Sequence, residues 1–279
     1  MSSPRLSVLL FILFAAIAGE GRAQTLLFPD FTSTSGLLRL NAAQSVNGAV
    51  LLAQNQQDRS GSVFTKSQYN ITGFSAAFEF RISSPGGTND GIAAGADGIA
   101  FVVQRVGETA LGGSGEGMGY GPRAGTPGIA TSLAVEFDTF KNSWDPNSNH
   151  IGIDANGSLT SLATANIATA FDNGAKWSVW VDYNGTVLEV RASTNGLRPE
   201  LATLSHTIDI VGTIGGSSAY LGFTGGTGQA YGTHEILNFA FSDTYLSGGI
   251  AVVPEPSTYV LLALGLGFVG VTLWRRSPR

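Results

Sequence analysis

Short β-strand patterns follow one another along the middle of this 279-residue chain, and they leave few folds open to it. Across residues 24–243 the apolar positions show no sustained 3.6-residue repeat, which an amphipathic helix would need. Residues 75–82 instead alternate, with Phe78 and Phe80 on one side and Glu79 on the other. Further segments of this kind are residues 98–104, 132–140, 150–154 and 219–223. Antiparallel strands without helices predict an all-β sandwich or barrel, and about 220 residues suit one such domain.

The clearest local prediction is a β-hairpin. Residues 177–183 and 186–192 both have strand character, and Asn184-Gly185 stands between them. Asn-Gly suits the positive φ angles of a two-residue type I′ turn. We therefore expect these two segments to pair as neighbouring antiparallel strands.

Composition narrows the function. The chain has no cysteine, which excludes a disulfide scaffold, thiolate chemistry and cysteine-bound metal. Residues 24–243 contain 10 basic and 18 acidic side chains. An acidic domain is a poor match for a phosphate backbone, so no nucleic acid partner is expected. The same acidity is compatible with divalent cations.

The N-terminal residues have the form of a secretory signal peptide. Arg5 is followed by an apolar run over residues 6–18 and then by small and polar residues. Cleavage after Ala23 fits better than cleavage after Ala18, so residues 1–23 are the predicted signal peptide. The alternative is a membrane anchor, for which the run is short.

The C-terminal residues form a second targeting segment. Pro254-Glu255-Pro256 precedes an apolar stretch, residues 258–274, which predicts a minimal membrane-spanning helix. Arg275-Arg276 would stay cytoplasmic by the positive-inside rule, leaving the domain on the other side. Residues 254–279 resemble a PEP-CTERM sorting signal, and residues 244–253 are the predicted linker before it.

That resemblance implies a bacterium with an outer membrane and an exosortase as a partner during sorting. The chain would be exported across the inner membrane and anchored there transiently or lastingly. Its destination would then be the cell surface or the extracellular matrix. A plain C-terminal anchor is the alternative.

Carboxylates gather in the most informative segment of the domain. Glu136 and Asp138 lie on one face of a predicted strand, about 7 Å apart, and Asp145 and His150 follow in a turn-rich loop. Such carboxylates repel one another unless a cation lies between them. Oxygen ligands suit calcium, and mixed carboxylate and imidazole ligands suit a transition ion such as manganese. The spacing leaves open a two-ion site or solvated surface acids beside a structural histidine.

The same residues resemble a known family. Segments 136–140, 142–146 and 150–154 closely resemble the metal-binding segment of legume (L-type) lectins, of the bacterial secreted type. Segments 96–101 and 222–241 resemble other parts of that family. The resemblance implies a concanavalin-like jelly-roll β-sandwich over residues 24–243, binding sugar without catalysis.

The resemblance also implies a Ca²⁺ site beside a Mn²⁺ or other transition-ion site. Glu136 and His150 match ligands of the transition ion, and Asp138 and Asp145 match ligands shared by both ions. The Phe140 carbonyl and the Asn142 side chain match calcium ligands.

For sugar binding, the resemblance implies a hydrogen-bonding Asp97 after a cis peptide bond from Ala96. It also implies a stacking Phe140 ring and a donating Asn142 amide. A backbone N–H of a second loop completes the family's site. Gly117 is our predicted donor, although counting along the loop also allows Gly115 or Glu116 at that position. The fourth loop, residues 229–233, varies too much in the family for its sequence to indicate a sugar.

We therefore expect metal-dependent binding of glycans or extracellular polysaccharide, with a possible homo-oligomer. A matrix or adhesion scaffold that has lost sugar binding is the first alternative. A glycoside hydrolase on the same sandwich is the second. Related glucanases place a third carboxylate along the strand, where this chain has Phe140 and Lys141.

Overall fold

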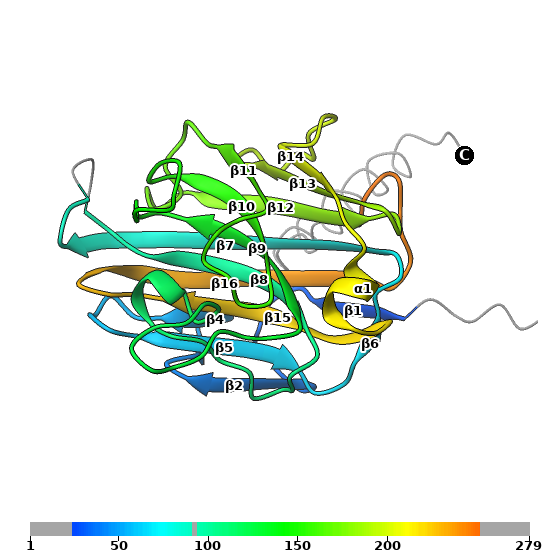
Figure 1. Ribbon diagram of the computed structural model, residues 1–279, viewed down its shortest axis with the longest axis horizontal. Coiled ribbons are helices and arrows are strands. Elements are labelled where there is room, and N and C mark those ends of the chain that lie inside the picture. Colours follow the sequence, from blue (N-terminus) through cyan, green and yellow to red (C-terminus); the bar gives the residue numbers. More distant parts are fainter. Residues whose placement is uncertain (1–23, 91–93, 252–279) are drawn as a thin grey trace, which may run out of the picture.

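The computed structural model describes residues 24–90 and 94–251, which form a sandwich of two antiparallel β-sheets (Figure 1). The predicted signal peptide and sorting signal lie outside the described residues. Strands of both sheets run lengthwise through the molecule, and their connections gather at its two ends.

The first sheet has the order β14-β13-β12-β7-β16-β4-β3, and β1 pairs with β16. β7 and β16 are its long central strands. The bounds are β1 Thr25–Phe28, β3 Gln44–Val46, β4 Ala49–Ala53, β7 Phe74–Gly87, β12 Lys176–Tyr183, β13 Val187–Ser193, β14 Leu204–Thr207 and β16 Ala230–Ser242.

The second sheet has the order β11-β10-β9-β8-β15-β5-β2, and β6 pairs with β15. The bounds are β2 Leu37–Asn41, β5 Ser60–Thr65, β6 Tyr69–Asn70, β8 Gly98–Gln104, β9 Ser132–Asp138, β10 His150–Ala155, β11 Ala163–Asn166 and β15 Ser218–Gly226. Two short helices complete the described fold, the 3-10 turn η1 Gly115–Gly117 and α1 Ile210–Ile214. The predicted all-β sandwich and its seven predicted strand segments are thus confirmed.

The predicted hairpin forms, but its turn is not type I′. Tyr183 pairs with Leu188, and Asn184 donates its N–H to the Val187 carbonyl. Gly185 has φ +95°, whereas Asn184 is not in the left-handed region. The Asn184 carboxamide oxygen accepts the N–H groups of residues 186 and 187, and this contact holds the turn one residue later than predicted.

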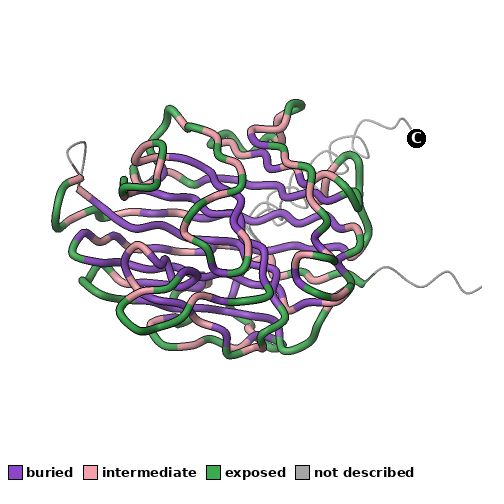
Figure 2. Tube along the Cα trace, in the orientation of Figure 1, coloured by how far each residue is buried: buried purple, intermediate pink, exposed green. Residues whose placement is uncertain are grey.

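The core between the sheets is rich in aromatic rings. Phe78 of β7 contacts Phe101, Phe137 and Phe223 of the opposite sheet, with ring centroids 4.9–5.9 Å apart. Figure 2 shows this burial as long purple stretches along the strands of the sandwich, with exposed residues mostly in the connections. The inward alternation predicted for Phe78 and Phe80 therefore sets which face of β7 meets the second sheet.

A smaller apolar cluster covers part of the outer face of the second sheet. Ala100, Val102 and Ala134 of the sheet meet Tyr120 and Ile129 of the glycine-rich connection between β8 and β9. The Tyr120 hydroxyl accepts the Gly157 N–H and is bonded to the Ser132 hydroxyl. This connection is thereby fixed against the sheet and holds η1 at one end of the sandwich.

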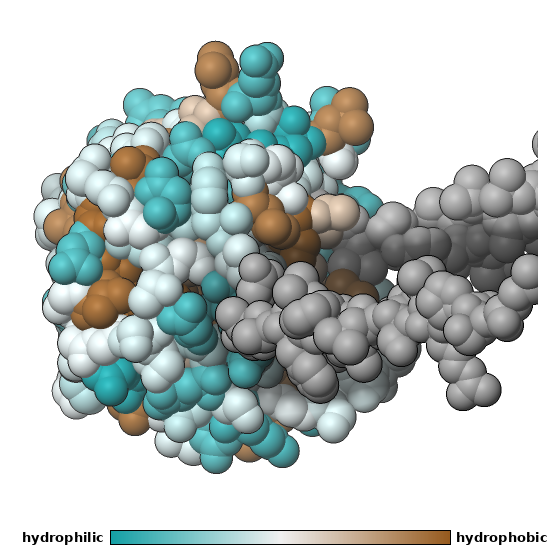
Figure 3. All heavy atoms as spheres, turned by 90° about the vertical axis from the view of Figure 1, so that its right-hand side faces the viewer, coloured by the Kyte–Doolittle hydropathy of each residue, from teal (hydrophilic) through white to brown (hydrophobic). Residues whose placement is uncertain are grey.

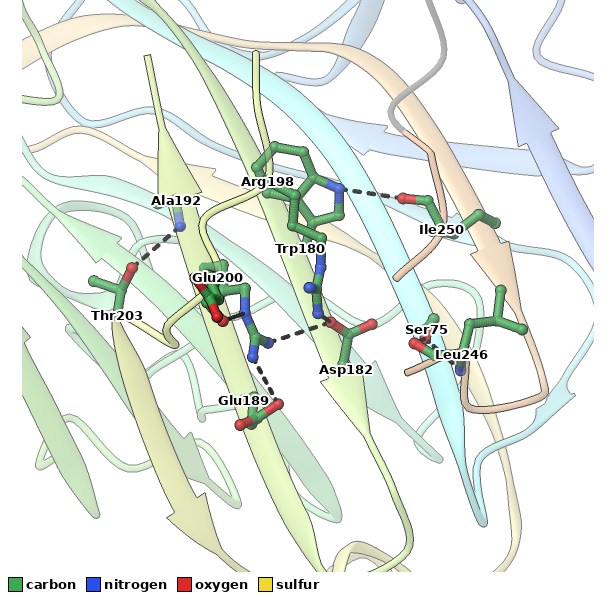
Figure 4. Close-up of polar contacts among 11 residues, drawn as sticks. Ser75, Trp180, Asp182, Glu189, Ala192, Arg198, Glu200, Thr203, Leu246 and Ile250 are labelled. Carbon is green, nitrogen blue, oxygen red and sulfur yellow. Dashed lines mark hydrogen bonds and ion pairs between the residues drawn. The ribbon is translucent and has the colours of Figure 1, made fainter. Parts of the chain in front are cut away.

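The described part of the predicted linker lies against the first sheet (Figure 4). The Trp180 indole donates to the Ile250 carbonyl at 3.1 Å, and the Leu246 N–H donates to the Ser75 hydroxyl at 3.0 Å. Residues 244–251 thus pack onto β7 and β12 before the chain leaves the described region.

Asp182 has two arginine partners on this face (Figure 4). It is buried, 2.7 Å from Arg198 and 3.6 Å from Arg191. An Asp182→Ala variant should lose about 3 kcal/mol of unfolding free energy, because the largely buried Arg198 loses its carboxylate partner and the buried Arg191 keeps only Glu189. Urea unfolding measures this. Glu189→Gln, at the more exposed partner of Arg191, is the control and should cost under about 1 kcal/mol. An equal loss in both variants would contradict the prediction.

Figure 3 faces the end of the sandwich where α1 and β6 lie. The described residues visible there mix hydrophilic and apolar side chains, and the apolar ones form small separate groups. Nowhere in residues 24–90 and 94–251 is a helix both long and apolar enough to cross a membrane. The predicted spanning segment, residues 258–274, lies outside the described residues.

Candidate functional site

Strand ends from both sheets converge at the end of the sandwich opposite α1 and β6. In the second sheet, Gly98 pairs with Asp138, and Asp138 pairs with His150. In the first sheet, Ala230 at the start of β16 pairs with Gly87 at the end of β7. The loops that follow or precede these residues therefore share one end, which Figure 1 shows at the left.

The structure brings three of the predicted metal ligands together. One ligand atom from each of Asp138, Asp145 and His150 lies within 4.8 Å of the others. Asp138 and His150 are buried at the paired ends of β9 and β10, and Asp145 is half-buried in the following loop. Two carboxylates and an imidazole at this spacing fit a divalent cation with mixed oxygen and nitrogen ligands.

Glu136 joins this group from the middle of β9. Its Oε1 lies 3.3 Å from His150 Nε2 and accepts the Ser161 hydroxyl at 2.8 Å. Gly152 faces it from β10, and a Cβ at that glycine would lie 2.3 Å from Glu136 Oε1. The glycine therefore leaves room for the Glu136 carboxylate above β10, and any other residue at position 152 would fill that space with its side chain.

Loop hydrogen bonds orient the remaining predicted calcium ligands. The Phe140 N–H donates to Asp138 Oδ1 at 2.8 Å, and the Asn142 N–H donates to Asp145 Oδ2 at 2.7 Å. The chain therefore bends around the two carboxylates just after β9. Phe140 and Asn142 are brought to the same rim as Asp138 and Asp145.

The electrostatics of the cluster favour a bound cation. Burial raises the pKa of Asp138 well above its usual value, and the charges of Glu136 and Asp145 raise it further. The pKa of Asp145 is also raised, chiefly by burial. Burial also works against ionisation of Glu136. Hydrogen bonds with His150, Asp154 and Ser161 nevertheless hold the pKa of Glu136 below its usual value. A divalent ion would remove the cost of ionising these carboxylates together.

Asp154 extends the cluster although we assigned it no role from sequence. It is buried on the same face of β10 as His150, and burial beside Glu136 raises its pKa well above the usual value. The alternation of side chains along a strand could have placed Asp154 in the cluster, because residues 150, 152 and 154 of one strand share a face.

A small pocket of about 210 Å³ lies beside this cluster. Asp97, Phe140 and Asn142, three of the four predicted sugar-binding residues, line it. The remaining lining residues are Thr88, Glu116, Arg123, Gly228, Gln229 and Ala230. The peptide bond from Ala96 to Asp97 is cis, as the family resemblance implies.

Asp97 is the polar centre of the pocket. It is only 5% exposed, and its Oδ2 has no hydrogen-bond partner among the described residues. Burial raises the pKa of Asp97 to about 8, and the nearby Glu116 charge adds to this increase. A buried carboxyl oxygen without a partner is suited to a hydroxyl or ammonium group of a ligand.

Gly117, the fourth predicted sugar-binding residue, is not brought to the pocket. It is buried in η1, and its N–H donates to the Ser114 carbonyl at 3.1 Å. Its neighbour Glu116 lines the pocket instead, together with Arg123 from further along the same connection. Arg123 had no motif to single it out, because only the folded connection brings it back to Glu116.

The sandwich, the carboxylate cluster at its strand ends and the adjoining polar pocket define a class of carbohydrate-binding proteins with the lectin fold. The legume lectin domain model matches residues 23–251, and the chain therefore belongs to that family. The PEP-CTERM protein-sorting motif matches residues 252–277. Both resemblances, of the domain to legume lectins and of the C-terminal residues to a PEP-CTERM sorting signal, are thus confirmed.

Individual relatives agree with this membership. The chain is 30% identical to Lectin DB58 of Vigna unguiculata subsp. cylindrica over 87% of this chain and 92% of that protein. It resembles the solved basic winged bean lectin with Tn-antigen, with TM-score 0.66 and 26% identity over 79% of this chain and 98% of that one. A winged bean acidic lectin complexed with methyl-alpha-D-galactose gives TM-score 0.67 and 25% identity, with the same coverage.

Family membership also decides between binding and catalysis. Legume lectins are non-enzymatic carbohydrate-binding proteins, so the prediction of a binding protein and not an enzyme is confirmed. The glycoside hydrolase alternative receives no support from these relatives.

Proposed function

We propose that this chain is a Ca²⁺- and Mn²⁺-dependent lectin that binds glycans or extracellular polysaccharide in the pocket beside Asp97. The observation that supports this most directly is the buried, unpartnered Oδ2 of Asp97 next to the Asp138, Asp145 and His150 group. Glu136, Asp138, Asp145 and His150 would hold the transition ion, and Asp138, Asp145, Asn142 and the Phe140 carbonyl would hold calcium.

Within the pocket, each predicted residue has a distinct part. Asp97 accepts hydrogen bonds from sugar hydroxyls, and the Asn142 amide donates one. The Phe140 ring stacks on the apolar face of the sugar. The ions act on this arrangement through the loop, because Asp138 accepts the Phe140 N–H and Asp145 accepts the Asn142 N–H.

We further propose export and exosortase-dependent sorting. The matched sorting motif over residues 252–277 supports this, as does the signal-peptide pattern of residues 1–23. The lectin domain would then be displayed on the cell surface or in the extracellular matrix of a bacterium with an outer membrane, after a transient or lasting stay in the inner membrane.

A glycan array tests the binding proposal. The full chain, purified in mild detergent and loaded with Ca²⁺ and Mn²⁺, should bind a subset of glycans and lose that binding in EDTA. Asp97→Ala should abolish binding by removing the acceptor, with an expected loss on the order of 100-fold or more.

An exposed asparagine at the opposite end supplies the control. Asn70 pairs with Ser218 at the start of β15, so Asn70→Ala should bind glycans as the wild type does. If the folded, metal-loaded wild type binds no glycan at all, the matrix or adhesion scaffold is the better reading of this family member.

A further inference from the structure

Carboxylates outnumber cationic side chains around the sugar pocket. Asp97 and Glu116 line it, and Arg123 is the one basic residue among its lining residues in the described chain. Arg123 is itself shared, because its Nη1 lies 3.0 Å from Asp58 Oδ1 and its Nε lies 3.1 Å from Glu116 Oε2. The carboxylates of Asp58 and Glu116 therefore share one guanidinium, and this pairing leaves one negative charge uncompensated whether Asp97 is ionised or protonated.

Arg123 fixes Glu116 in place. Besides the two carboxylates, the guanidinium donates to the Ser114 hydroxyl at 3.0 Å, and its side chain is only 23% exposed. The Glu116 side chain is 32% exposed, so its carboxylate is held from one side and remains accessible from the pocket. An anchored carboxylate at the edge of a small pocket is preorganised to accept hydrogen bonds from a ligand.

Asp97 supplies an independent sign that a ligand belongs there. Its buried Oδ2 has no partner among the described residues, and it belongs to the same pocket as Glu116. Glu136, Asp138 and Asp145 offset three of the four positive charges of the two proposed ions, so the negative charge that a ligand meets in the pocket is the local one of the Glu116 carboxylate. The pocket therefore offers acceptors that carry negative charge, whereas the hydroxyl groups of a neutral sugar would need only uncharged acceptors.

We propose that Glu116, held by Arg123, selects sugars that carry a protonated amino group, that is, hexosamines without an N-acetyl group. This inference rests on the proposed lectin function and concerns the same pocket. An ammonium group has three donors and a positive charge, and charge-assisted hydrogen bonds are about twice as strong as neutral ones. Uronic acid units, being anionic, are repelled by the same carboxylates.

The test compares matched methyl glycosides in both the glucose and galactose series. Each series includes the 2-amino, 2-acetamido, 2-hydroxyl and uronic acid forms, titrated by calorimetry against the full metal-loaded chain near pH 6, where an amine is protonated. In the series that binds, the 2-amino form should bind about tenfold more tightly than the 2-hydroxyl and 2-acetamido forms. Raising the salt concentration should shrink that ratio.

Glu116→Gln keeps the size of the side chain and removes its charge. It should bring the ratio between amino and hydroxyl forms close to one. Glu108→Gln is the matched control, because Glu108 follows β8 at the other end from Asp97 and should leave the ratio at its wild-type value.

Equal binding of amino and neutral forms by the wild type overturns the proposal. So does a preference that survives in Glu116→Gln, or tighter binding of the uronic acid form. In these cases the lectin function stands. Absence of binding to every probe and to the glycan array, with folded and metal-loaded protein, overturns the lectin function and the amino-sugar preference together.

Discussion

An Asp138→Asn variant should lose metal and glycan binding together. Asp138 is one of the two carboxylates that both proposed ions would share, and it also accepts the Phe140 N–H that shapes the adjoining rim. We expect affinity for Ca²⁺ and Mn²⁺ to fall by at least about 100-fold, since even residues behind the direct ligands change metal affinity 10–100-fold. Calorimetric titration with each ion, followed by the glycan array, measures both losses.

Stability should change in the opposite direction when metal is absent. The pKa of Asp138 is raised from 3.8, so its ionised form is disfavoured in the fold. Its contribution to stability is therefore fully present below pH 3.8 and is lost as the pH rises through the raised value. In EDTA at pH 7, Asp138→Asn should be at least as stable as the wild type, because it removes the buried charge. With metal, only the wild type should gain stability.

The N-cap of α1 provides a control with the same chemical change. The Asp209 side chain accepts the Gly212 N–H, and asparagine caps helices about as well as aspartate. Asp209→Asn should keep wild-type metal affinity and glycan binding. If Asp138→Asn bound both ions normally, the arrangement of ions proposed for this end of the sandwich would be wrong.

Strand alternation explains why much of this site could be predicted from sequence. Glu136 and Asp138 share a face of β9 because successive side chains of a strand point to opposite sides. The register of β9 with β10 then places His150 beside Asp138 and Gly152 beside Glu136. The period of two fixes the first fact, and the second depends on the register in which residues 139–149 return the chain to β9.

The parts of the site that could not be predicted depend on the exact shape of a turn or on contacts between residues that are distant in the sequence. Gly117 and Glu116 are adjacent in sequence, and only the tight turn of η1 decides which of them faces the pocket. Arg123 reaches the pocket because the glycine-rich connection doubles back, placing its guanidinium against Gly115, as well as against Asp58 from another loop. The hairpin turn shows the same limit on a smaller scale, because a side-chain hydrogen bond of Asn184 outweighed the backbone preference of Asn-Gly.

His234 should make the domain sensitive to mild acid. It lies on β16 between Ile82 and Ala53 of the neighbouring strands, fully buried, and neither ring nitrogen has a hydrogen-bond partner among the described residues. Burial lowers the pKa of His234 from 6.5 to about 3. As the pH falls below about 6.5, His234 therefore becomes protonated in the unfolded chain but stays neutral in the folded chain.

The sign of the effect follows from that difference. The pKa of His234 is lower in the folded chain than in the unfolded chain. The domain therefore has its full stability with respect to His234 above pH 6.5, and it loses stability as the pH falls towards 3. A gap of this size corresponds to about 5 kcal/mol over the whole range. By pH 5 the loss should be about 2 kcal/mol.

Urea unfolding at pH 7 and pH 5, with His234→Leu beside the wild type, isolates this contribution from the carboxylates of the metal site. The wild type should lose about 2 kcal/mol more unfolding free energy than His234→Leu between the two pH values, because leucine has no proton to take up. His206→Gln, at a partly exposed position of β14, is the control and should keep the wild-type dependence on pH. Parallel losses in the wild type and His234→Leu would show that the protonation of His234 is not what opposes folding in acid.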